Sequence, residues 1–329
     1  MTAVALGTLR IGTRRSPLAL AQAGQVADVL RGAGYDVELV EVVTDGDRSP
    51  EALTSLGGVG VFVTELRRRL LDGTVEVAVH SLKDLPTETL AGVALAAVPH
   101  RADPRDALVS GRGQLLAELD PGTSVGTGSP RRAAQLRALG LGLEVVPIRG
   151  NVDSRLRQVA DGALGAVVVA AAGLQRLGRV HEATEILDPG QMLPAPGQGA
   201  LAVECREADS QVRAALAAAL DHPASRAAVD AERALLATLE AGCSAPVGAL
   251  ADVATGDDGE EIYLRAVVAT VDGEMSLRLS ATGRPGEANE VGRRLAEDLL
   301  AAGAADLMPA PPKSFGDSPP GKTTIGDRT

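Results

Sequence analysis

The stretch Ser124–Arg132, Ser-Val-Gly-Thr-Gly-Ser-Pro-Arg-Arg, decides the fold because an earlier segment repeats its pattern. Its first four residues predict a short strand, and the Ser-Pro pair is typical of the N-cap and first position of a helix. The earlier copy, Arg10–Leu20, reads Arg-Ile-Gly-Thr-Arg-Arg-Ser-Pro-Leu-Ala-Leu. In both copies a second strand, a helix ending at Asp-Gly and a buried apolar strand follow. Strands that alternate with helices predict parallel α/β units, so we expect two similar lobes with a cleft between them.

The rest of the chain follows a different pattern. Residues 221–240 predict an amphipathic helix, and three strand-like runs with Asp-Gly turns precede a last helix over 287–302. That order predicts a small α+β domain with a three-stranded antiparallel sheet, and the Pro-, Gly- and Ser-rich end predicts a disordered tail. The expected limits are 1–99 with 200–219 for the first lobe, 100–199 for the second lobe, 220–308 for the α+β domain and 309–329 for the tail.

Composition argues against several classes of protein. The chain has 329 residues, a net charge of −11, two Phe, two Tyr and no Trp, so the basic surface and aromatic stacking of nucleic-acid binding are not expected. No apolar run is long enough to cross a membrane, and no signal-peptide pattern is present. Two cysteines and four scattered histidines give no metal-ligand spacing. We therefore expect a cytoplasmic protein with reduced thiols.

One lysine stands out because the chain otherwise prefers arginine. Lys83 is the only lysine before residue 313, although Lys and Arg together number 32. It follows an apolar run, lies beside Asp84, and is soon followed by Pro86, which stops regular structure. Chemistry that needs a compact ammonium on a flexible stem would place a lysine here. The alternative is a lysine placed by chance on a solvated loop.

Several arginines fall at one predicted edge of the lobes, just after a strand or in the first turns of the next helix. In open α/β sheets that edge binds ligands, and helix N-termini there favour anions. Arginine adds bidentate pairing to carboxylate or phosphate, so we expect a compact polyanion as the ligand. The alternative is that these are solvated helix-start residues, but cations there oppose the helix dipole unless a ligand compensates. The arginines concerned are Arg14, Arg131, Arg132, Arg149 and Arg155.

The two cysteines have different surroundings. Cys243 lies in a Gly-, Ser- and Pro-containing loop and is expected to be accessible, whereas Cys205 alternates within a strand and is expected to be buried. For a lone cysteine, inert packing is the commoner outcome. The glycine pairs within Gly57–Gly60 and Gly197–Gly199 are interpreted as structural turns, the second of them between domains.

Together, seven segments resemble the porphobilinogen deaminase family, also called hydroxymethylbilane synthases. They occur in the order of the family and cover about residues 8–305. The segments are Arg10–Leu20, His80–Pro86, Val125–Arg132, Arg149–Val152, Ala172–Gly178, Pro194–Glu204 and Leu239–Gly248.

The resemblance implies two lobes like those of periplasmic binding proteins and a third domain that carries a cysteine. It implies a dipyrromethane cofactor joined by a thioether to Cys243, to which four porphobilinogen molecules are added head to tail with loss of ammonia. A monomer is also expected. By motif match, Asp84 would stabilise the cation formed on deamination and handle protons, with Lys83 beside it in the catalytic site. The implied cofactor-binding residues are Cys243, Lys83, Asp84, Ser129, Arg131, Arg132 and Arg155. The implied substrate- and chain-binding residues are Arg14, Ser16, Arg149, Arg155 and Arg176.

One departure from the family and two alternative functions are also visible. Family members often carry lysines in the glycine loop, where this chain has Ser55 and Val59, so a lid that acts through charge is in doubt. A noncatalytic solute-binding protein would fit the two lobes but leave Cys243 and the third domain unexplained. A Schiff-base enzyme using Lys83 would need that lysine desolvated, whereas the adjacent Asp84 is expected to hold it charged.

Overall fold

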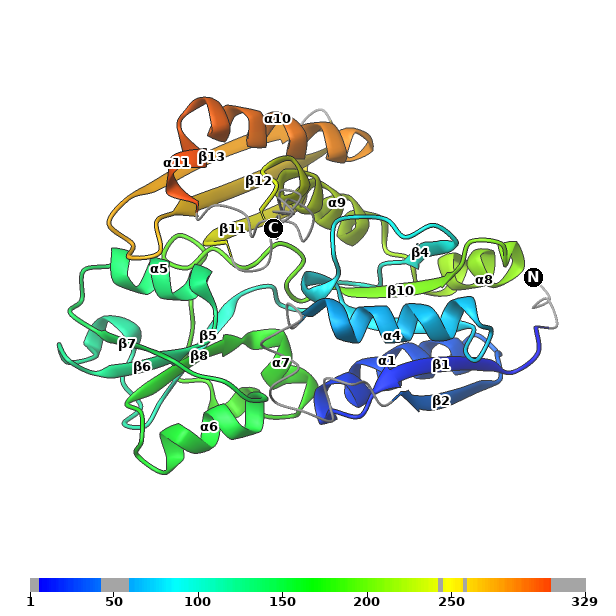
Figure 1. The fold of residues 1–329 in the computed structure, drawn as a ribbon, viewed down its shortest axis with the longest axis horizontal. Helices are drawn as coiled ribbons and strands as arrows, with labels where there is room; N and C mark the ends of the chain where they lie inside the picture. Colours follow the sequence, from blue (N-terminus) through cyan, green and yellow to red (C-terminus); the bar gives the residue numbers. More distant parts are fainter. Residues whose placement is uncertain (1–5, 43–58, 242–244, 257–258, 309–329) are drawn as a thin grey trace, which may run out of the picture.

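The computed structural model describes residues 6–42, 59–241, 245–256 and 259–308, with the backbone alone at 59–62. Figure 1 shows two α/β lobes side by side, with a third domain, coloured yellow to orange, above both. The predicted fold class is confirmed, because the structure has two five-stranded sheets and a separate three-stranded antiparallel sheet. Within the described residues, no helix has the length and apolar character needed to cross a membrane.

The first lobe is built on a sheet with strand order β2-β1-β3-β10-β4. Its core forms because apolar residues alternate onto the faces that the helices cover; Ile11, Leu30, Val77 and Val203 are almost completely buried. The strands are β1 (Leu9–Arg14), β2 (Val37–Val42), β3 (Val77–Ser81), β4 (Val93–Ala97) and β10 (Leu201–Arg206). The helices are α1 (Pro17–Gly32), α4 (Val59–Leu71) and α8 (Ser210–Leu220).

The second lobe repeats the first, with strand order β7-β6-β8-β5-β9. Its strands are β5 (Asp106–Ser110), β6 (Ser124–Thr127), β7 (Glu144–Pro147), β8 (Ala166–Ala170) and β9 (Glu185–Ile186). Its helices are α5 (Pro130–Ala138), α6 (Val152–Ala160) and α7 (Ala171–Arg176). Because β6, β7 and β8 take the places of β1, β2 and β3, the repeat predicted from the sequence is confirmed.

The expectation of purely parallel α/β units was wrong at one position in each sheet. The fourth strand, β10 in the first lobe and β5 in the second, runs antiparallel to its neighbour β3 or β8. Each of these strands is the first strand in the chain after it has crossed from the other lobe. A buried strand has the same apolar composition in either direction, and the sequence pattern therefore cannot report this reversal.

The third domain packs two helices on one face of an antiparallel sheet, as expected from the sequence. The sheet has order β11-β12-β13, and its strand pairs are both antiparallel. Leu235 and Leu295, from the two long helices, and Leu264 of the central strand are fully buried in its core. The elements are α9 (Pro223–Thr238), β11 (Val247–Gly256), β12 (Gly259–Ala269), β13 (Ser276–Gly283), α10 (Ala288–Ala301) and α11 (Ala304–Leu307).

One buried carboxylate joins the three parts. Glu232 of α9 is fully buried and pairs with Arg101, which lies on the segment crossing from the first lobe to the second. The same carboxylate accepts hydrogen bonds from the backbone N–H of Gly197, on the returning segment (2.6 Å), and of Ala251 in β11 (2.8 Å). This one carboxylate therefore fastens the third domain to both crossing segments.

Candidate functional site

The site begins where two strands of the first lobe end. Arg14 is the last residue of β1, and Ser16 caps the following α1, its hydroxyl accepting from the N–H of Ala19 at 3.3 Å. In the second lobe, Ser129 caps α5 in the same way. Both predicted caps are confirmed, and each places a polar side chain at the cleft edge of its lobe.

The Lys83–Asp84 pair lies in a short 3-10 helix, η1 (Leu82–Asp84), directly after β3. Its first residue is fully buried, and its N–H donates to the carbonyl of Ala200 at 3.0 Å. On the other side, Arg233 of α9 donates to the carbonyls of the two residues that follow Asp84, at 3.0 and 2.7 Å. The turn is therefore fixed from both ends, by the returning segment and by the third domain.

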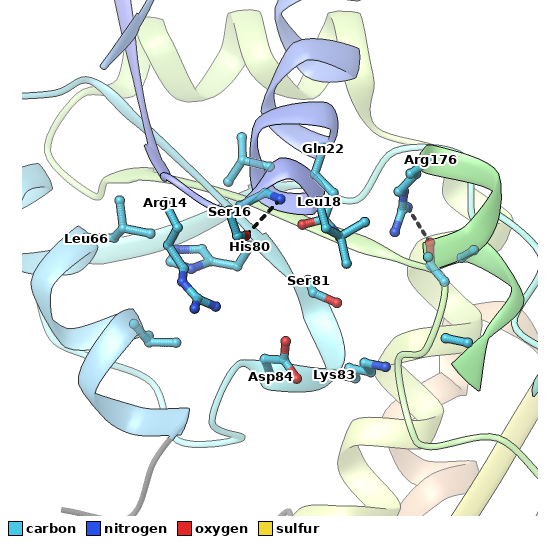
Figure 2. A pocket seen from close by; sticks show the side chains of 17 residues that line it. Arg14, Ser16, Leu18, Gln22, Leu66, His80, Ser81, Lys83, Asp84 and Arg176 are labelled. Atoms are coloured by element: carbon cyan, nitrogen blue, oxygen red, sulfur yellow. Dashed lines mark hydrogen bonds between the residues drawn. The ribbon is translucent and has the colours of Figure 1, made fainter. Parts of the chain in front are cut away.

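A first cavity, of about 330 Å³, opens beside this turn. Figure 2 shows Arg14 and Ser16 on one side of it, Asp84 on the opposite side and Arg176 at a third side. Arg176 donates to the carbonyl of Gly199 at 2.7 Å, and burial lowers its pKa to about 10. Three of the predicted substrate-binding residues, from both lobes, thus surround one space.

A second cavity, of about 310 Å³, shares Lys83 and Asp84 with the first. The other predicted cofactor-binding residues that the structure describes line this second cavity: Ser129, Arg131, Arg132 and Arg155. Arg149 differs, because it is exposed between β7 and α6 and lines neither cavity. The structure therefore separates the predicted residues into two adjoining groups with the Lys83–Asp84 turn as their common wall.

Arg131 and Arg132 are not solvated helix-start residues, so that alternative was wrong. They are 3% and 5% exposed and both pair with Asp106, a fully buried carboxylate at the start of β5, at 2.8 Å. Burial alone would raise the pKa of Asp106, but the two guanidinium groups lower it to about 2. Asp106 therefore supplies within the protein the negative charge that cations at a helix N-terminus need.

The turn at Gly197–Gly199 lies between the second lobe and β10, as expected for a turn between domains. Both glycines have positive φ, and a Cβ on the second would lie 2.5 Å from the carbonyl oxygen of Ala102. Glycine is therefore required there, because the two crossing segments touch through their backbones. The turn buries Gln198 between the lobes, where the side chain is 1% exposed.

Gln198 connects charged groups from the two lobes. Its Oε1 accepts from Lys83 Nζ at 3.3 Å and from Arg132 Nη2 at 3.4 Å, and its Nε2 donates to Asp106 Oδ1 at 2.8 Å. One amide thus bridges the lysine of the first lobe and the ion pair of the second.

The expectation that Asp84 keeps Lys83 charged needs correction. Burial lowers the pKa of Lys83 to about 8 and outweighs the neighbouring carboxylate of Asp84, which raises it. The ammonium is still mostly protonated at neutral pH but loses its proton in mildly alkaline solution. The error arose because a sequence shows the adjacent charge and does not show how much solvent is excluded.

Comparison with known proteins identifies the family. Residues 9–214 match the family model described as "Porphobilinogen deaminase, dipyromethane cofactor binding domain", and residues 227–301 match "Porphobilinogen deaminase, C-terminal domain". The chain belongs to the porphobilinogen deaminase family. A porphobilinogen deaminase of Nocardia farcinica is 58% identical over 94% of this chain and 90% of its own length. One of Mycolicibacterium paratuberculosis is 57% identical over 91% of this chain and 96% of its own length.

Membership of the porphobilinogen deaminase family confirms the predicted function and enzyme class. The chain is an enzyme of the hydroxymethylbilane synthase type, which polymerises pyrroles for tetrapyrrole biosynthesis. The alternatives of a noncatalytic solute-binding protein and of a Schiff-base enzyme are thereby set aside. The large domain of this family binds a dipyrromethane cofactor.

Solved structures of solute-binding proteins overlap with part of this chain. A periplasmic substrate-binding protein from Coxiella burnetii covers 64% of this chain at 14% identity and a TM-score of 0.40. A methionine-binding protein covers 64% of this chain at 14% identity and a TM-score of 0.41. This partial overlap adds nothing to the assignment of function.

The second cavity suits a dipyrromethane, whose pyrrole rings carry carboxylate groups. Its described wall presents an ammonium, three guanidinium groups and the hydroxyl of Ser129. Among the described residues, Arg131 Nε is buried without a hydrogen-bond partner. Such a donor set matches a polycarboxylate, because charge-assisted hydrogen bonds to carboxylates are the strong ones.

The cysteines and the glycine loop are described only in part. Cys205 in β10 is fully buried, as its position in a strand predicted. Burial raises the pKa of its thiol to about 11. Cys243 lies outside the described residues, as do Ser55, Gly57 and Gly58. Val59 is the first residue of α4.

Sequence reasoning missed three residues at the site. Asp106, Gln198 and Arg233 contact the predicted residues or the turn that holds them. A signal for Asp106 was present, since an aspartate that opens an otherwise apolar strand has to be paired when that strand is buried. No comparable signal marks Arg233, whose contacts come from a distant part of the chain.

Proposed function

We propose that Cys243 carries the dipyrromethane through a thioether and that four porphobilinogen molecules are joined to it head to tail, with loss of ammonia. The observation that carries this proposal is the pair of cavities that share Lys83 and Asp84. One cavity suits the cofactor and the other an incoming substrate. When bound, the dipyrromethane supplies the pyrrole carbon to which the first substrate is added.

We assign the second cavity to the cofactor carboxylates. Lys83, Ser129, Arg131 and Arg132 are proposed to bind them, with Arg155 at the edge of the site. Burial lowers the pKa of Arg131 and of Arg155, and an anion in this cavity would relieve that unfavourable burial of positive charge.

The first cavity is assigned to the incoming porphobilinogen. Arg14, Ser16 and Arg176 are proposed to bind its acetate and propionate groups. A charge-assisted hydrogen bond contributes about 1.5–3 kcal/mol, so several are needed to order a flexible growing chain. Arg149 and Arg155 are proposed to contact that chain as it lengthens; the exposed position of Arg149 suits a contact made only late in elongation.

Asp84 is the proposed catalytic residue, because its carboxylate belongs to both cavities. Fixed negative charge there would stabilise the cation that forms when the amino group of the substrate's aminomethyl side chain leaves as ammonia and its methylene carbon stays on the pyrrole. The same carboxylate would accept the proton lost when the new carbon–carbon bond is complete.

Replacing Asp84 by Asn tests this role. Asn keeps the shape but removes the charge and the base, so cofactor-loaded Asp84→Asn should bind porphobilinogen yet turn over at least about a hundredfold more slowly. Asp84→Glu should retain measurable activity. Single-turnover rates, normalised to folded and loaded enzyme, are the measurement. The contrary outcome is that Asp84→Asn and Lys83→Met both lose activity only because less protein folds, while the folded fraction of Asp84→Asn turns over at a normal rate. In that case the pair only shapes the turn.

The covalent link is tested by the mass of the intact protein. We expect the purified protein to be heavier than its sequence by one dipyrromethane and Cys243→Ser to lack the addition. Cys205→Ser is the matched control. Because that thiol is fully buried, replacing it should leave the addition in place. An unmodified native protein, or an adduct on Cys205, would contradict the proposal.

We further propose the domain limits 1–99 with 200–219, 100–199 and 220–308, and a cytoplasmic monomer that binds neither nucleic acid nor membrane. The limits are supported by sheet membership, since β4 and β10 lie in the first sheet and β5 in the second. The net charge of −11 supports the absence of a nucleic-acid partner. Light scattering of the purified protein would measure its oligomeric state.

A further inference from the structure

Like charges are crowded around the second cavity. Lys83 comes from the first lobe, and Arg131, Arg132 and Arg155 come from the second. Two of these arginines are almost completely buried, so water screens their mutual repulsion poorly. Such a group of cations stays assembled only if something within the protein compensates its charge.

Asp106 provides that compensation at close range. Its Oδ1 accepts from Arg132 Nε at 3.0 Å and Nη2 at 2.8 Å, while its Oδ2 lies 2.8 Å from Arg131 Nη2. One carboxylate therefore orients both guanidinium groups. Arg132 is fixed further by donating from Nη1 to the carbonyl of Val168 at 3.0 Å. Asp106 itself lines neither cavity, so it acts through the arginines.

The influence of Asp106 extends into the other lobe. Gln198 donates to Asp106 Oδ1, and this bond fixes the amide so that its Oε1 faces Lys83 Nζ and Arg132 Nη2. A second donation from Gln198 Nε2, to the carbonyl of Pro104 at 2.8 Å, supports the same orientation. The negative charge of Asp106 also favours the protonated form of Lys83.

We propose that Asp106 is a positioning residue, the internal counter-ion that keeps the cations of the two lobes assembled before an anionic ligand arrives, with Gln198 carrying its effect to Lys83. The inference rests on the proposed function only in taking that ligand to be the dipyrromethane. Once carboxylates of the cofactor are bound, they supply negative charge of their own, and the protein depends less on Asp106.

This dependence predicts different effects on the cofactor-free and cofactor-loaded protein. Asp106→Asn keeps the shape of the side chain but leaves the buried cations without their counter-ion. The melting temperature of the cofactor-free protein should therefore fall more than that of the loaded protein, and the gap between the two should widen. A residue that only packs β5 would lower both melting temperatures alike.

Asp103→Asn is the matched control, since Asp103 lies three residues earlier and pairs with Arg105 in a partly exposed position. It should leave the gap unchanged. Protein produced without porphobilinogen, before and after loading with porphobilinogen, provides the two forms. Equal losses in both forms of Asp106→Asn would overturn the proposal.

The lysine content of the chain permits a second, independent measurement. With Lys313→Arg and Lys322→Arg in the background, Lys83 is the only lysine left, so its ¹³Cε signal in labelled protein follows the titration of one ammonium. In the cofactor-free protein, Asp106→Asn should move the titration midpoint to lower pH, whereas Asp103→Asn should not. Adding Gln198→Glu to Asp106→Asn returns a negative charge next to Lys83 and should move the midpoint back up.

If Asp106→Asn does not fold, Gln198→Met still tests the connection. Removing the amide acceptor should also lower the midpoint, because a hydrogen bond to the charged form favours that form. A midpoint that stays at the wild-type value in every foldable variant would overturn the inference. This titration needs no cofactor, so its failure is distinct from failure of the proposed function, which the missing mass addition would reveal.

Discussion

Lys83 holds a titratable charge where the rest of the chain uses arginine. Its neighbours Arg131 and Arg132 lower its pKa in addition to burial, while Asp84 and Asp106 raise it. An arginine in its place would stay charged at pH values near 8. The lysine therefore makes the positive charge of the second cavity sensitive to pH near 8.

This sensitivity predicts a pH dependence of cofactor uptake. As pH rises through about 8, cofactor-free protein loses the Lys83 charge, and uptake should slow. Lys83→Arg should take up cofactor more slowly at neutral pH, because its geometry is altered, but should lose less between pH 7 and 9. Loading followed by intact mass at several pH values is the measurement. The same alkaline loss in both proteins would show that another group titrates.

The same shift has the opposite effect on stability. Lys83 has a folded pKa of about 8 against an ordinary value of 10.5, so between these values the unfolded chain binds more protons. The contribution of Lys83 to the free energy of unfolding therefore becomes more favourable as pH rises through that window. As pH rises, anion uptake thus weakens while the unfavourable contribution of Lys83 to folding becomes smaller.

At the residue scale, the sequence predicted the positions that follow strands and missed those that depend on distant contacts. Ser16 and Ser129 were found because capping is local. Asp106 was missed because its importance depends on β5 lying beside β8, which order along the chain does not reveal. Arg149 and Arg155 looked equivalent in sequence but differ in exposure and in the cavity they reach.

At the scale of elements, a buried ion pair fixes α4 to the first sheet. Arg67 of α4 contacts Glu204 of β10 at 2.8 Å, and His80 Nε2 of β3 lies 3.2 Å from the same carboxylate. Burial would raise the pKa of Glu204, but the contact with His80 and the hydrogen bonds from Arg67 lower it to about 2. Since His80 also lines the first cavity, this contact connects the packing of α4 to the wall of that cavity.

Glu204→Gln should destabilise the protein at neutral pH by about 3–5 kcal/mol, the usual result of removing one partner from a buried pair. Because the folded pKa of Glu204 is depressed, its contribution is complete above the ordinary value of 4.5 and is lost as pH falls toward 2. The difference between wild type and variant should therefore shrink in acid. Denaturant unfolding at pH 7 and pH 3 measures it.

Glu65→Gln is the control on the same helix, where Glu65 pairs with Arg68 and Arg69 in a more exposed position. Exposed pairs contribute about 0–1 kcal/mol, so little change is expected. If Glu204→Gln had an effect equally small, α4 would be held by apolar packing alone.

Helices and strands were predicted correctly where turn residues clearly separate them. The three strands of the third domain were found because Asp-Gly turns separate alternating segments. Strands β4 and β5 were not predicted, since Val-Ala-Leu-Ala-Ala and Asp-Ala-Leu-Val-Ser are short and lack a helix between them. The direction of β5 follows from the path of the chain between the lobes, which is a property of the whole molecule.

At the scale of the molecule, the two crossing segments and the third domain meet at Glu232. Arg101 Nη1 and Nη2 bind the two oxygens of this carboxylate at 2.7 and 3.0 Å, and its Nε donates to the carbonyl of Gln198 at 2.8 Å. The junction therefore borders the amide that bridges Lys83 and Asp106. Nothing in the sequence around Glu232 indicated this, because its contacts come from three separate regions.

Glu232→Gln should uncouple the three parts of the molecule. The amide cannot pair with the Arg101 guanidinium or accept equally from the N–H groups of Gly197 and Ala251, so we expect a loss of about 3–5 kcal/mol. Unfolding followed by calorimetry should broaden or split, because domains that lose their common contact unfold less cooperatively. Hydrogen exchange at those two amides should accelerate before the cores of the lobes open.

Glu290→Gln, which breaks an exposed pair with Arg293 on α10, should change none of these measurements. A single sharp transition and unchanged exchange in Glu232→Gln would show that apolar contacts, such as those joining Leu193 to Leu250 and Val267, hold the third domain in place.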